Sequence, residues 1–295
     1  MQSELFNGTG VALITPFDDS GNIDYTSLQN LLDYIIDGGI NFIAMQGTTG
    51  EPSTLTPQER QQLRKFVVEY VNNRVPIMYG IGGNNTAAII DEIKNTDLKG
   101  IDAILSISPF YTKPNQRGIY EHFKAIATAS PLPIVIYNVP GRTARNVDAQ
   151  TVVQLAKDCP NIIAVKEASG NMAQIMNIIK TKPESLSLIS GDDALTLPMY
   201  SLGATGVISV IANVLPKEFS TMVNLCAKGD FKSATKIHFK LLDLMNALFE
   251  DGSPAGAKAA LAYLGIIKEN LRLPLVPVCE SVREKIITSI TNARQ

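Results

Sequence analysis

The sequence predicts an α/β protein, a (β/α)8 barrel of the TIM type with a C-terminal helical extension. Eight short apolar runs rich in Ile and Val recur along the chain, and segments of helical periodicity lie between them. This alternation repeats at a step of about 20 to 35 residues, as expected for βα units. The 295 residues suffice for one barrel over residues 1–224 and an extension over residues 225–295, because α/β barrels commonly reach this length.

The eight runs have the composition of strands that are buried on both faces, which is typical of parallel sheets. Glycine, proline or polar residues end each run. The predicted strands are Gly10–Ile14, Asn41–Gln46, Pro76–Gly80, Asp102–Ser108, Pro133–Asn138, Asn161–Lys166, Leu186–Gly191 and Gly206–Val210.

Helical segments fill the gaps, and from Pro216 onward they follow one another without intervening strands. The helix that begins at Gln58 has the clearest start, because Thr56, Pro57 and Glu59 supply an N-cap, a proline at the first position and a capping box. The predicted helices are Thr26–Asp37, Gln58–Asn72, Thr86–Asn95, Gly118–Thr128, Ala149–Asp158, Met172–Lys180, Lys217–Lys228, Phe231–Phe249, Pro254–Leu264 and Val278–Asn292.

An open, doubly wound sheet is the rival architecture, and it would bind a dinucleotide through a G-x-G-x-x-G loop. The segment Gly80–Gly83 lacks that spacing, because Asn85 stands in place of the last glycine. The lysine of a phosphate-binding P-loop is also missing. The pattern therefore favours the closed barrel.

Charge and composition exclude several functions. The formal net charge is −2, which disfavours electrostatic binding to nucleic acid or to acidic membranes. No signal peptide is recognisable, and the apolar stretch Gly206–Leu215 is too short to cross a bilayer, so we expect a soluble, cytoplasmic protein. The three cysteines form no C-x-x-C pair and the two histidines no H-E-x-x-H motif, so we predict no metal site.

Lys166 is the most informative residue at the C-terminal strand ends, where barrel enzymes place their catalytic groups. It closes an otherwise apolar strand, and loss of hydration there favours the neutral amine that attacks carbonyl groups to form a Schiff base. A structural ion pair with Asp192, Asp193 or Glu167 explains the lysine equally well. The residue alone does not decide between the two interpretations.

Other strand ends carry hydroxyl groups and an arginine. With no histidine placed for proton transfer, Tyr137, Tyr111 and Thr48 are the candidate proton carriers. Thr48 and Thr49 lie in a glycine-flanked turn that suits a carboxylate, and Arg142 follows in a Pro-Gly turn where its guanidinium suits another. Taken singly, a tyrosine here has a packing explanation and an arginine an ordinary loop explanation. The combination favours a Schiff-base enzyme.

Seven motifs resemble those of one known family, in the same order along nearly the whole chain. They are GTTGE (Gly47–Glu51), SPFYTKP (Ser108–Pro114), YNVPGRT (Tyr137–Thr143), KEASG (Lys166–Gly170), GDD (Gly191–Asp193), GVISVIANV (Gly206–Val214) and LRLPLVP (Leu271–Pro277). With them the sequence resembles the dihydrodipicolinate synthase family, which belongs to the pyruvate-dependent class I lyases related to N-acetylneuraminate lyase.

The resemblance implies condensation of pyruvate with L-aspartate-4-semialdehyde, the entry step of diaminopimelate and lysine synthesis, without metal or organic cofactor. It implies a Schiff base on Lys166 and a proton relay through the hydroxyl groups named above, with Tyr111 inserted from a neighbouring subunit of a dimer of dimers. Thr49 would bind the pyruvate carboxylate and Arg142 that of the semialdehyde. Backbone carbonyls of Gly191 and Ile208 would line the pocket.

Two alternatives stay open, namely a pyruvate-dependent aldolase for a sugar acid or hydroxy-oxo acid, and a non-catalytic barrel that binds a keto acid. Arg142 favours the synthase, since relatives that act on such acids generally lack an arginine there. The chain departs from lysine-inhibited family members around their effector pocket, although Asn84 is retained. We therefore predict weak or absent feedback by lysine. The departing positions are Pro57, Arg60, Ala88 and Phe110.

Overall fold

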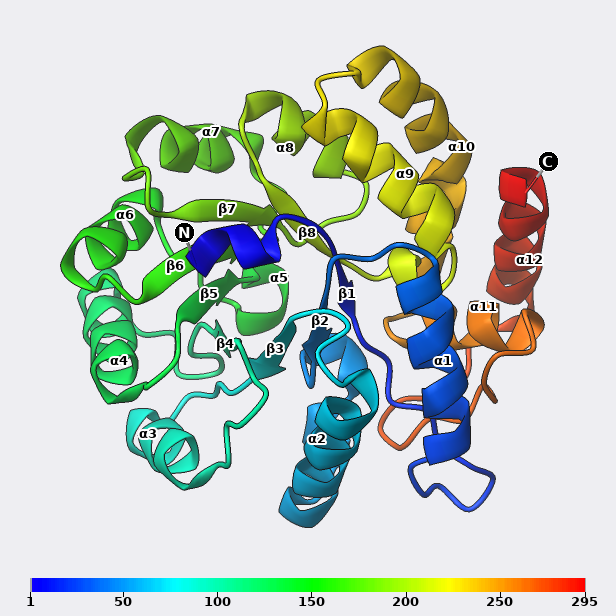
Figure 1. The fold of residues 1–295 in the computed structure, drawn as a ribbon, viewed down its shortest axis with the longest axis horizontal. Helices are drawn as coiled ribbons and strands as arrows, with labels where there is room; N and C mark the ends of the chain where they lie inside the picture. Colours follow the sequence, from blue (N-terminus) through cyan, green and yellow to red (C-terminus); the bar gives the residue numbers. More distant parts are fainter. Residues whose placement is uncertain (1, 295) are drawn as a thin grey trace.

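The eight strands pair in parallel and close into a barrel in the computed structural model, which describes residues 2–294. Each strand pairs with its neighbours in the chain, and β8 pairs with β1 (Figure 1). This confirms the (β/α)8 architecture and excludes the open sheet. The strands are β1 (Gly8–Ala12), β2 (Phe42–Met45), β3 (Ile77–Gly80), β4 (Ala103–Ile107), β5 (Ile134–Asn138), β6 (Ile162–Glu167), β7 (Ser187–Ser190) and β8 (Gly206–Ser209).

Strand β1 begins at Gly8 rather than at the predicted Gly10. Gly8 is in register with Gly206 of β8, and its N–H donates to the carbonyl of Thr205 at 2.9 Å. Thr9 is fully buried although it is polar. The hydrophobic pattern could not include Thr9, because pairing with β8 rather than side-chain polarity fixes the start of this strand.

Helices cover the outside of the barrel and follow the strands in turn (Figure 1). The predicted capping box is present, since Thr56 Oγ1 accepts from the Glu59 N–H at 3.2 Å and Glu59 Oε2 from the Thr56 N–H at 2.9 Å. Two short helices were not predicted, α5 (Pro140–Thr143) after β5 and α8 (Thr196–Leu202) after β7. The other helices between strands are α1 (Tyr25–Asp37), α2 (Pro57–Val71), α3 (Thr86–Asn95), α4 (Gln116–Ala129), α6 (Ala149–Asp158) and α7 (Met172–Thr181).

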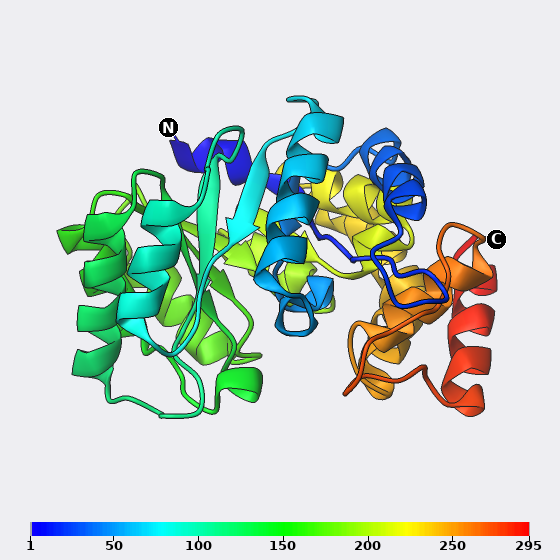
Figure 2. The ribbon, with the colours of Figure 1, turned by 90° about the horizontal axis from the view of Figure 1, so that it is seen from below.

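The C-terminal helices gather at one side of the barrel, as Figures 1 and 2 both show. They are α9 (Pro216–Ala227), α10 (Phe231–Glu250), α11 (Ala255–Tyr263) and α12 (Glu280–Arg294). Helix α10 packs against α9 and α12, and α9 also contacts β1. The predicted division between residues 224 and 225 falls inside α9, and it stays a prediction.

The two ends of the barrel differ. At the end where the strands begin, the 3-10 helix η1 (Gln2–Phe6) leads directly into β1, and the buried Phe6 ring meets Phe42 edge-on with centroids 5.3 Å apart. The opposite end collects the loops that follow the strands, which is where sites lie in such barrels. Within residues 2–294, no helix is long and apolar enough to cross a membrane.

Candidate active site

A cavity of about 730 Å³ opens where the strands end. Seven of the eight predicted site residues line it, although they come from widely separated parts of the sequence. They are Thr48, Thr49, Tyr137, Arg142, Lys166, Gly191 and Ile208. Parallel pairing places these strand ends side by side, so the fold assembles the predicted site from residues that no local pattern connects.

Lys166 lies near the end of β6 and reaches this cavity. Only 6% of the residue is exposed, and its Nζ lies 4.1 Å from the centroid of the Tyr137 ring. The two residues are register partners on adjacent strands. Among the described residues Lys166 forms no ion pair, so its amine is available for chemistry in the cavity.

Two of the carboxylates that could have paired with Lys166 are engaged elsewhere. Glu167 accepts from Asn138 Nδ2 at 3.0 Å and from the Ser169 N–H at 2.8 Å. Asp193 Oδ2 accepts from the Ile211 N–H at 2.8 Å. These contacts account for both acids as structural groups and leave the ion-pair interpretation of Lys166 without support.

Asp193 lines the cavity, and the sequence did not indicate its structural role. Burial raises its pKa to about 6, against the opposing hydrogen bonds from the N–H groups of Val210 and Ile211. Its Oδ1 has no hydrogen-bond partner among the described residues. Asp193 thereby ties the loop after β7 to the end of β8, beside Ile208. Its place in the GDD motif was the available signal, but the motif does not reveal this contact.

Gly191 provides the space that the Lys166 side chain occupies. A Cβ at this position would lie 2.7 Å from Ala168 Cβ and 3.0 Å from Lys166 Cε. Such approaches force a neighbour to shift, so a larger residue would press on both the Ala168 side chain and the lysine stem. Gly191 therefore leaves room for the lysine side chain, in addition to its predicted role of lining the pocket with its carbonyl.

Thr48 and Thr49 lie on a short 3-10 turn, η2 (Thr48–Gly50), directly after β2. The Thr15 hydroxyl donates to the Gly50 carbonyl at 2.8 Å, which ties this turn to the end of β1. Glu51 ends the turn in the left-handed conformation, with φ 52° and ψ 41°. The turn presents both threonines to the cavity.

Tyr111 is the predicted site residue that the structure does not bring into the cavity. It is 86% exposed, on the loop after β4. The Thr112 N–H donates to the Phe110 carbonyl at 2.8 Å, so Tyr111 is the apex of a three-residue turn with φ 68°. This conformation is costly for a residue with a side chain. At this tight turn the ring is left exposed to solvent.

Arg142 lies on α5 at the mouth of the cavity, where its side chain is exposed. The far wall comes from α10, a contribution that the sequence did not indicate, because an amphipathic helix shows which face is buried but not what that face meets. The α10 residues that line the cavity are Met245, Asn246, Phe249 and Glu250. The C-terminal helices thus complete the site as well as covering the barrel.

The family follows from the comparison with known proteins. A model of the dihydrodipicolinate synthetase (DHDPS) family matches residues 5–293. The chain belongs to this family. It is 50% identical over 279 residues to the 4-hydroxy-tetrahydrodipicolinate synthase of Phocaeicola vulgatus. The aligned region covers 95% of this chain and 94% of that relative.

Solved structures of DHDPS proteins superpose closely. The dihydrodipicolinate synthase of Aquifex aeolicus has a TM-score of 0.94 at 41% identity and covers 98% of both chains. The DHDPS of Cyanidioschyzon merolae, solved with lysine bound, has a TM-score of 0.94 at 39% identity over 98% of this chain and 99% of that one. These findings support the synthase over the aldolase and the keto-acid sensor, and the chain is an enzyme of the lyase class.

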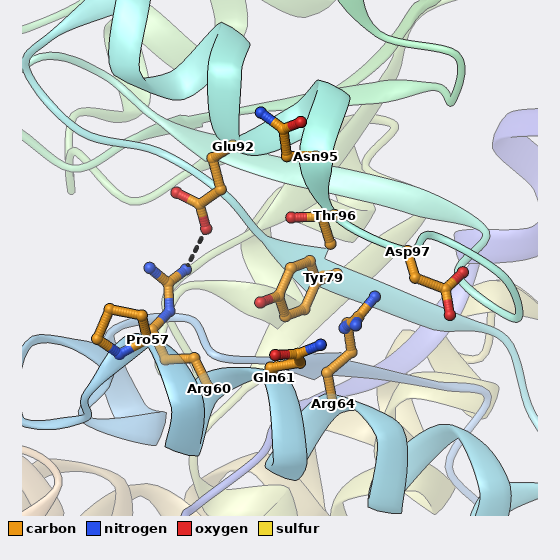
Figure 3. A pocket seen from close by; sticks show the side chains of 9 residues that line it. All are labelled: Pro57, Arg60, Gln61, Arg64, Tyr79, Glu92, Asn95, Thr96 and Asp97. Atoms are coloured by element: carbon orange, nitrogen blue, oxygen red, sulfur yellow. Dashed lines mark hydrogen bonds and ion pairs between the residues drawn. The ribbon is translucent and has the colours of Figure 1, made fainter.

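A second cavity of about 420 Å³ lies outside the barrel between α2 and α3 (Figure 3). It bears on the prediction of weak or absent inhibition by lysine. Pro57 and Arg60 line it, and an Arg60 Nη reaches Glu92 Oε1 at 2.7 Å. Arg60 also lines a neighbouring cavity of about 340 Å³ together with Phe110 and Thr48. The structure thus brings Arg60 close to the turn η2, with its guanidinium already paired.

Proposed function

We propose that the chain condenses pyruvate with L-aspartate-4-semialdehyde to 4-hydroxy-tetrahydrodipicolinate, the first step of the diaminopimelate and lysine branch. One observation carries the proposal, namely a buried lysine amine without an ion-pair partner, held against the Tyr137 ring in the strand-end cavity. A Schiff-base enzyme needs such an amine, and a structural lysine would have an acidic partner.

The reaction begins with attack of the Lys166 amine on the keto carbon of pyruvate. The carbinolamine loses water to give a Schiff base, and removal of a methyl proton gives an enamine. The enamine carbon attacks the aldehyde of the second substrate and forms the new carbon–carbon bond. The amino group of that substrate then displaces Lys166 from the former keto carbon, which closes the ring and frees the enzyme.

Hydroxyl groups carry the protons in this proposal. Tyr137 is adjacent to the Lys166 amine and serves the carbinolamine and enamine steps. Thr48 lines the same cavity. Tyr111 completes the relay from the neighbouring subunit, because its own turn exposes the ring. The active form is accordingly a tight dimer at least, and a homotetramer as a dimer of dimers.

The two carboxylates of the substrates bind at separate places. Thr49 receives that of pyruvate through its hydroxyl and the backbone of η2. Arg142, at the mouth, receives that of the semialdehyde by a forked contact. Gly191 and Ile208 line the same cavity, and we assign their backbone carbonyl groups to the wall of the substrate pocket. No metal or organic cofactor takes part in the proposed chemistry.

We also assign the enzyme to the cytoplasm, with weak or absent feedback by lysine. Cys159, Cys226 and Cys279 are all free thiols, which suits a reducing compartment. Arg60 is paired with Glu92, and Ala88 has no carboxylate to bind the ammonium group of a lysine effector.

Substrate comparison tests the proposed activity. Purified enzyme is assayed for condensation of pyruvate with aspartate semialdehyde, and in parallel for pyruvate release from N-acetylneuraminate and 4-hydroxy-2-oxoglutarate. We expect condensation and no retro-aldol cleavage. Cleavage of either acid without condensation would establish the aldolase instead.

A further inference from the structure

A buried ion pair joins the C-terminal helices to the turn that carries Thr48 and Thr49. Glu51 Oε1 lies 2.5 Å from Lys258 Nζ, and both side chains are 0% exposed. Glu51 follows η2 directly, whereas Lys258 lies on α11. The contact therefore links the β2 end of the barrel to a helix of the extension.

Lys258 is held from several sides. Its Nζ donates to the Asn270 carbonyl at 2.9 Å and lies 4.1 Å from the centroid of the Phe17 ring. The guanidinium carbon of Arg272 (Cζ) lies 4.5 Å from the centroid of the same ring. Burial lowers the pKa of Lys258 to about 8, Glu51 opposes this shift, and Arg272 adds to it. The charge of Glu51 thus keeps the lysine protonated near neutral pH.

Stability does not explain such a pair. Withdrawing two ions from water is expensive, and an apolar pair of similar volume is often as stable or more so. The pair does fix a position, however. Glu51 holds a left-handed backbone conformation, and its N–H donates to the Thr48 carbonyl at 3.2 Å. Holding the Glu51 side chain therefore holds the backbone of η2, on which Thr49 lies.

We infer that Lys258 is a positioning residue for pyruvate, acting through Glu51 on the turn that carries Thr48 and Thr49. The inference rests on the proposed function, in which Thr49 receives the pyruvate carboxylate. It gives α11 a part in substrate binding although Lys258 does not line the cavity. A shift of about 1 Å in such a turn is enough to weaken binding severely.

The test compares Lys258→Met, Glu51→Met and the double variant Glu51→Met/Lys258→Met with the wild type. Each single change leaves one buried polar group without its partner and lowers the melting temperature. The double variant has no buried charge at this site and regains stability, so it stays measurable where a single variant fails to fold. Lys268→Met is the matched control, because it removes an exposed ion pair between the extension and Asp19, which lies between β1 and α1.

In the double variant we expect the KM for pyruvate to rise by about tenfold or more. The KM for the semialdehyde should stay within about twofold of wild type, and borohydride at saturating pyruvate should still label Lys166. A merely structural role would move both KM values together or neither. An unchanged KM for pyruvate in the folded double variant overturns the inference.

The same labelling separates this inference from the proposed function. If borohydride fails to attach pyruvate to Lys166 in the wild type, the proposed function fails, and the inference with it. If the wild type is labelled and the KM for pyruvate of the double variant equals that of the wild type, only the positioning role of Lys258 fails. Lys268→Met should match the wild type in both KM values.

Discussion

Lys166 of β6 and Tyr137 of β5 are register partners on adjacent strands, and the lysine Nζ lies 4.1 Å from the centroid of the tyrosine ring. Backbone hydrogen bonds between β5 and β6 set this register. The amine and the phenol are therefore placed by two paired strands of the barrel rather than by a loop. Such preorganisation is what a multistep proton-transfer reaction requires.

Tyr111 should act in the site of the neighbouring subunit. We expect Tyr111→Phe to lower kcat by about 100-fold while Lys166 can still be labelled by pyruvate and borohydride. Co-expression of Tyr111→Phe with Lys166→Ala should restore activity, because each hybrid dimer has one site with an intact lysine and the other chain's Tyr111. Steady-state assay of the isolated hybrid checks this. An inactive hybrid would show that Tyr111 acts within its own chain.

Gly191→Ala should displace the Lys166 stem, since the added Cβ would lie 3.0 Å from Lys166 Cε. We expect kcat to fall by about 10- to 100-fold, and labelling of Lys166 to slow in parallel. Gly83→Ala is the control, because its new Cβ would meet only Ile89 at 3.8 Å. Equal activities of the two variants would mean that Lys166 tolerates the displacement.

The Glu59–Arg272 pair should govern part of the acid stability. Arg272 forks onto the carboxylate at 2.9 and 2.5 Å and lowers the pKa of Glu59 to about 2 from an ordinary 4.5. A carboxyl whose pKa is lower in the folded state stabilises the fold above its unfolded pKa and loses this contribution as pH falls. The affected window is thus pH 4.5 to about 2.

Glu59→Gln should lower the free energy of unfolding at pH 7 by about 1 to 3 kcal/mol and flatten its fall in that acid window. Urea titrations from pH 2 to 7 measure both effects. Asp33→Asn is the comparison, because its ion pair with Arg74 is more exposed, and such pairs contribute about 1 kcal/mol or less. A Glu59→Gln profile parallel to wild type would contradict the assignment.

Lysine should inhibit weakly or not at all. Arg60 is already paired with Glu92 near the effector region, and Ala88 offers no carboxylate to a cationic amino acid. We expect full activity at micromolar lysine in a steady-state assay, and greater sensitivity in the double variant Arg60→His/Ala88→Glu. Half-inhibition of the wild type by micromolar lysine would refute this.

Patterns that repeat were predictable from the sequence. The eight apolar runs predicted the barrel. Lys166 was recognisable as a candidate because a charged residue at the end of an apolar strand is unusual. Two short helices escaped prediction, since α5 has a single turn and α8 contains Pro198 within seven residues, too few for a helical period.

Contacts between distant segments were out of reach. Glu51 and Lys258 each looked like an ordinary charged residue of a motif or a helix, and only the fold brings them to 2.5 Å. The contribution of α10 to the cavity is of the same kind. Local sequence determines which face of a helix is buried, whereas the packing of the whole chain determines what that face meets.

Borohydride reduction in the presence of pyruvate shows whether the Lys166 amine forms a Schiff base. The enzyme is incubated with pyruvate, reduced, digested and analysed by mass spectrometry. We expect one reduced pyruvyl adduct on the peptide that contains Lys166, no adduct in Lys166→Ala, and wild-type labelling in Arg142→Ala. Absence of an adduct in the wild type, or an adduct on another lysine, would contradict it.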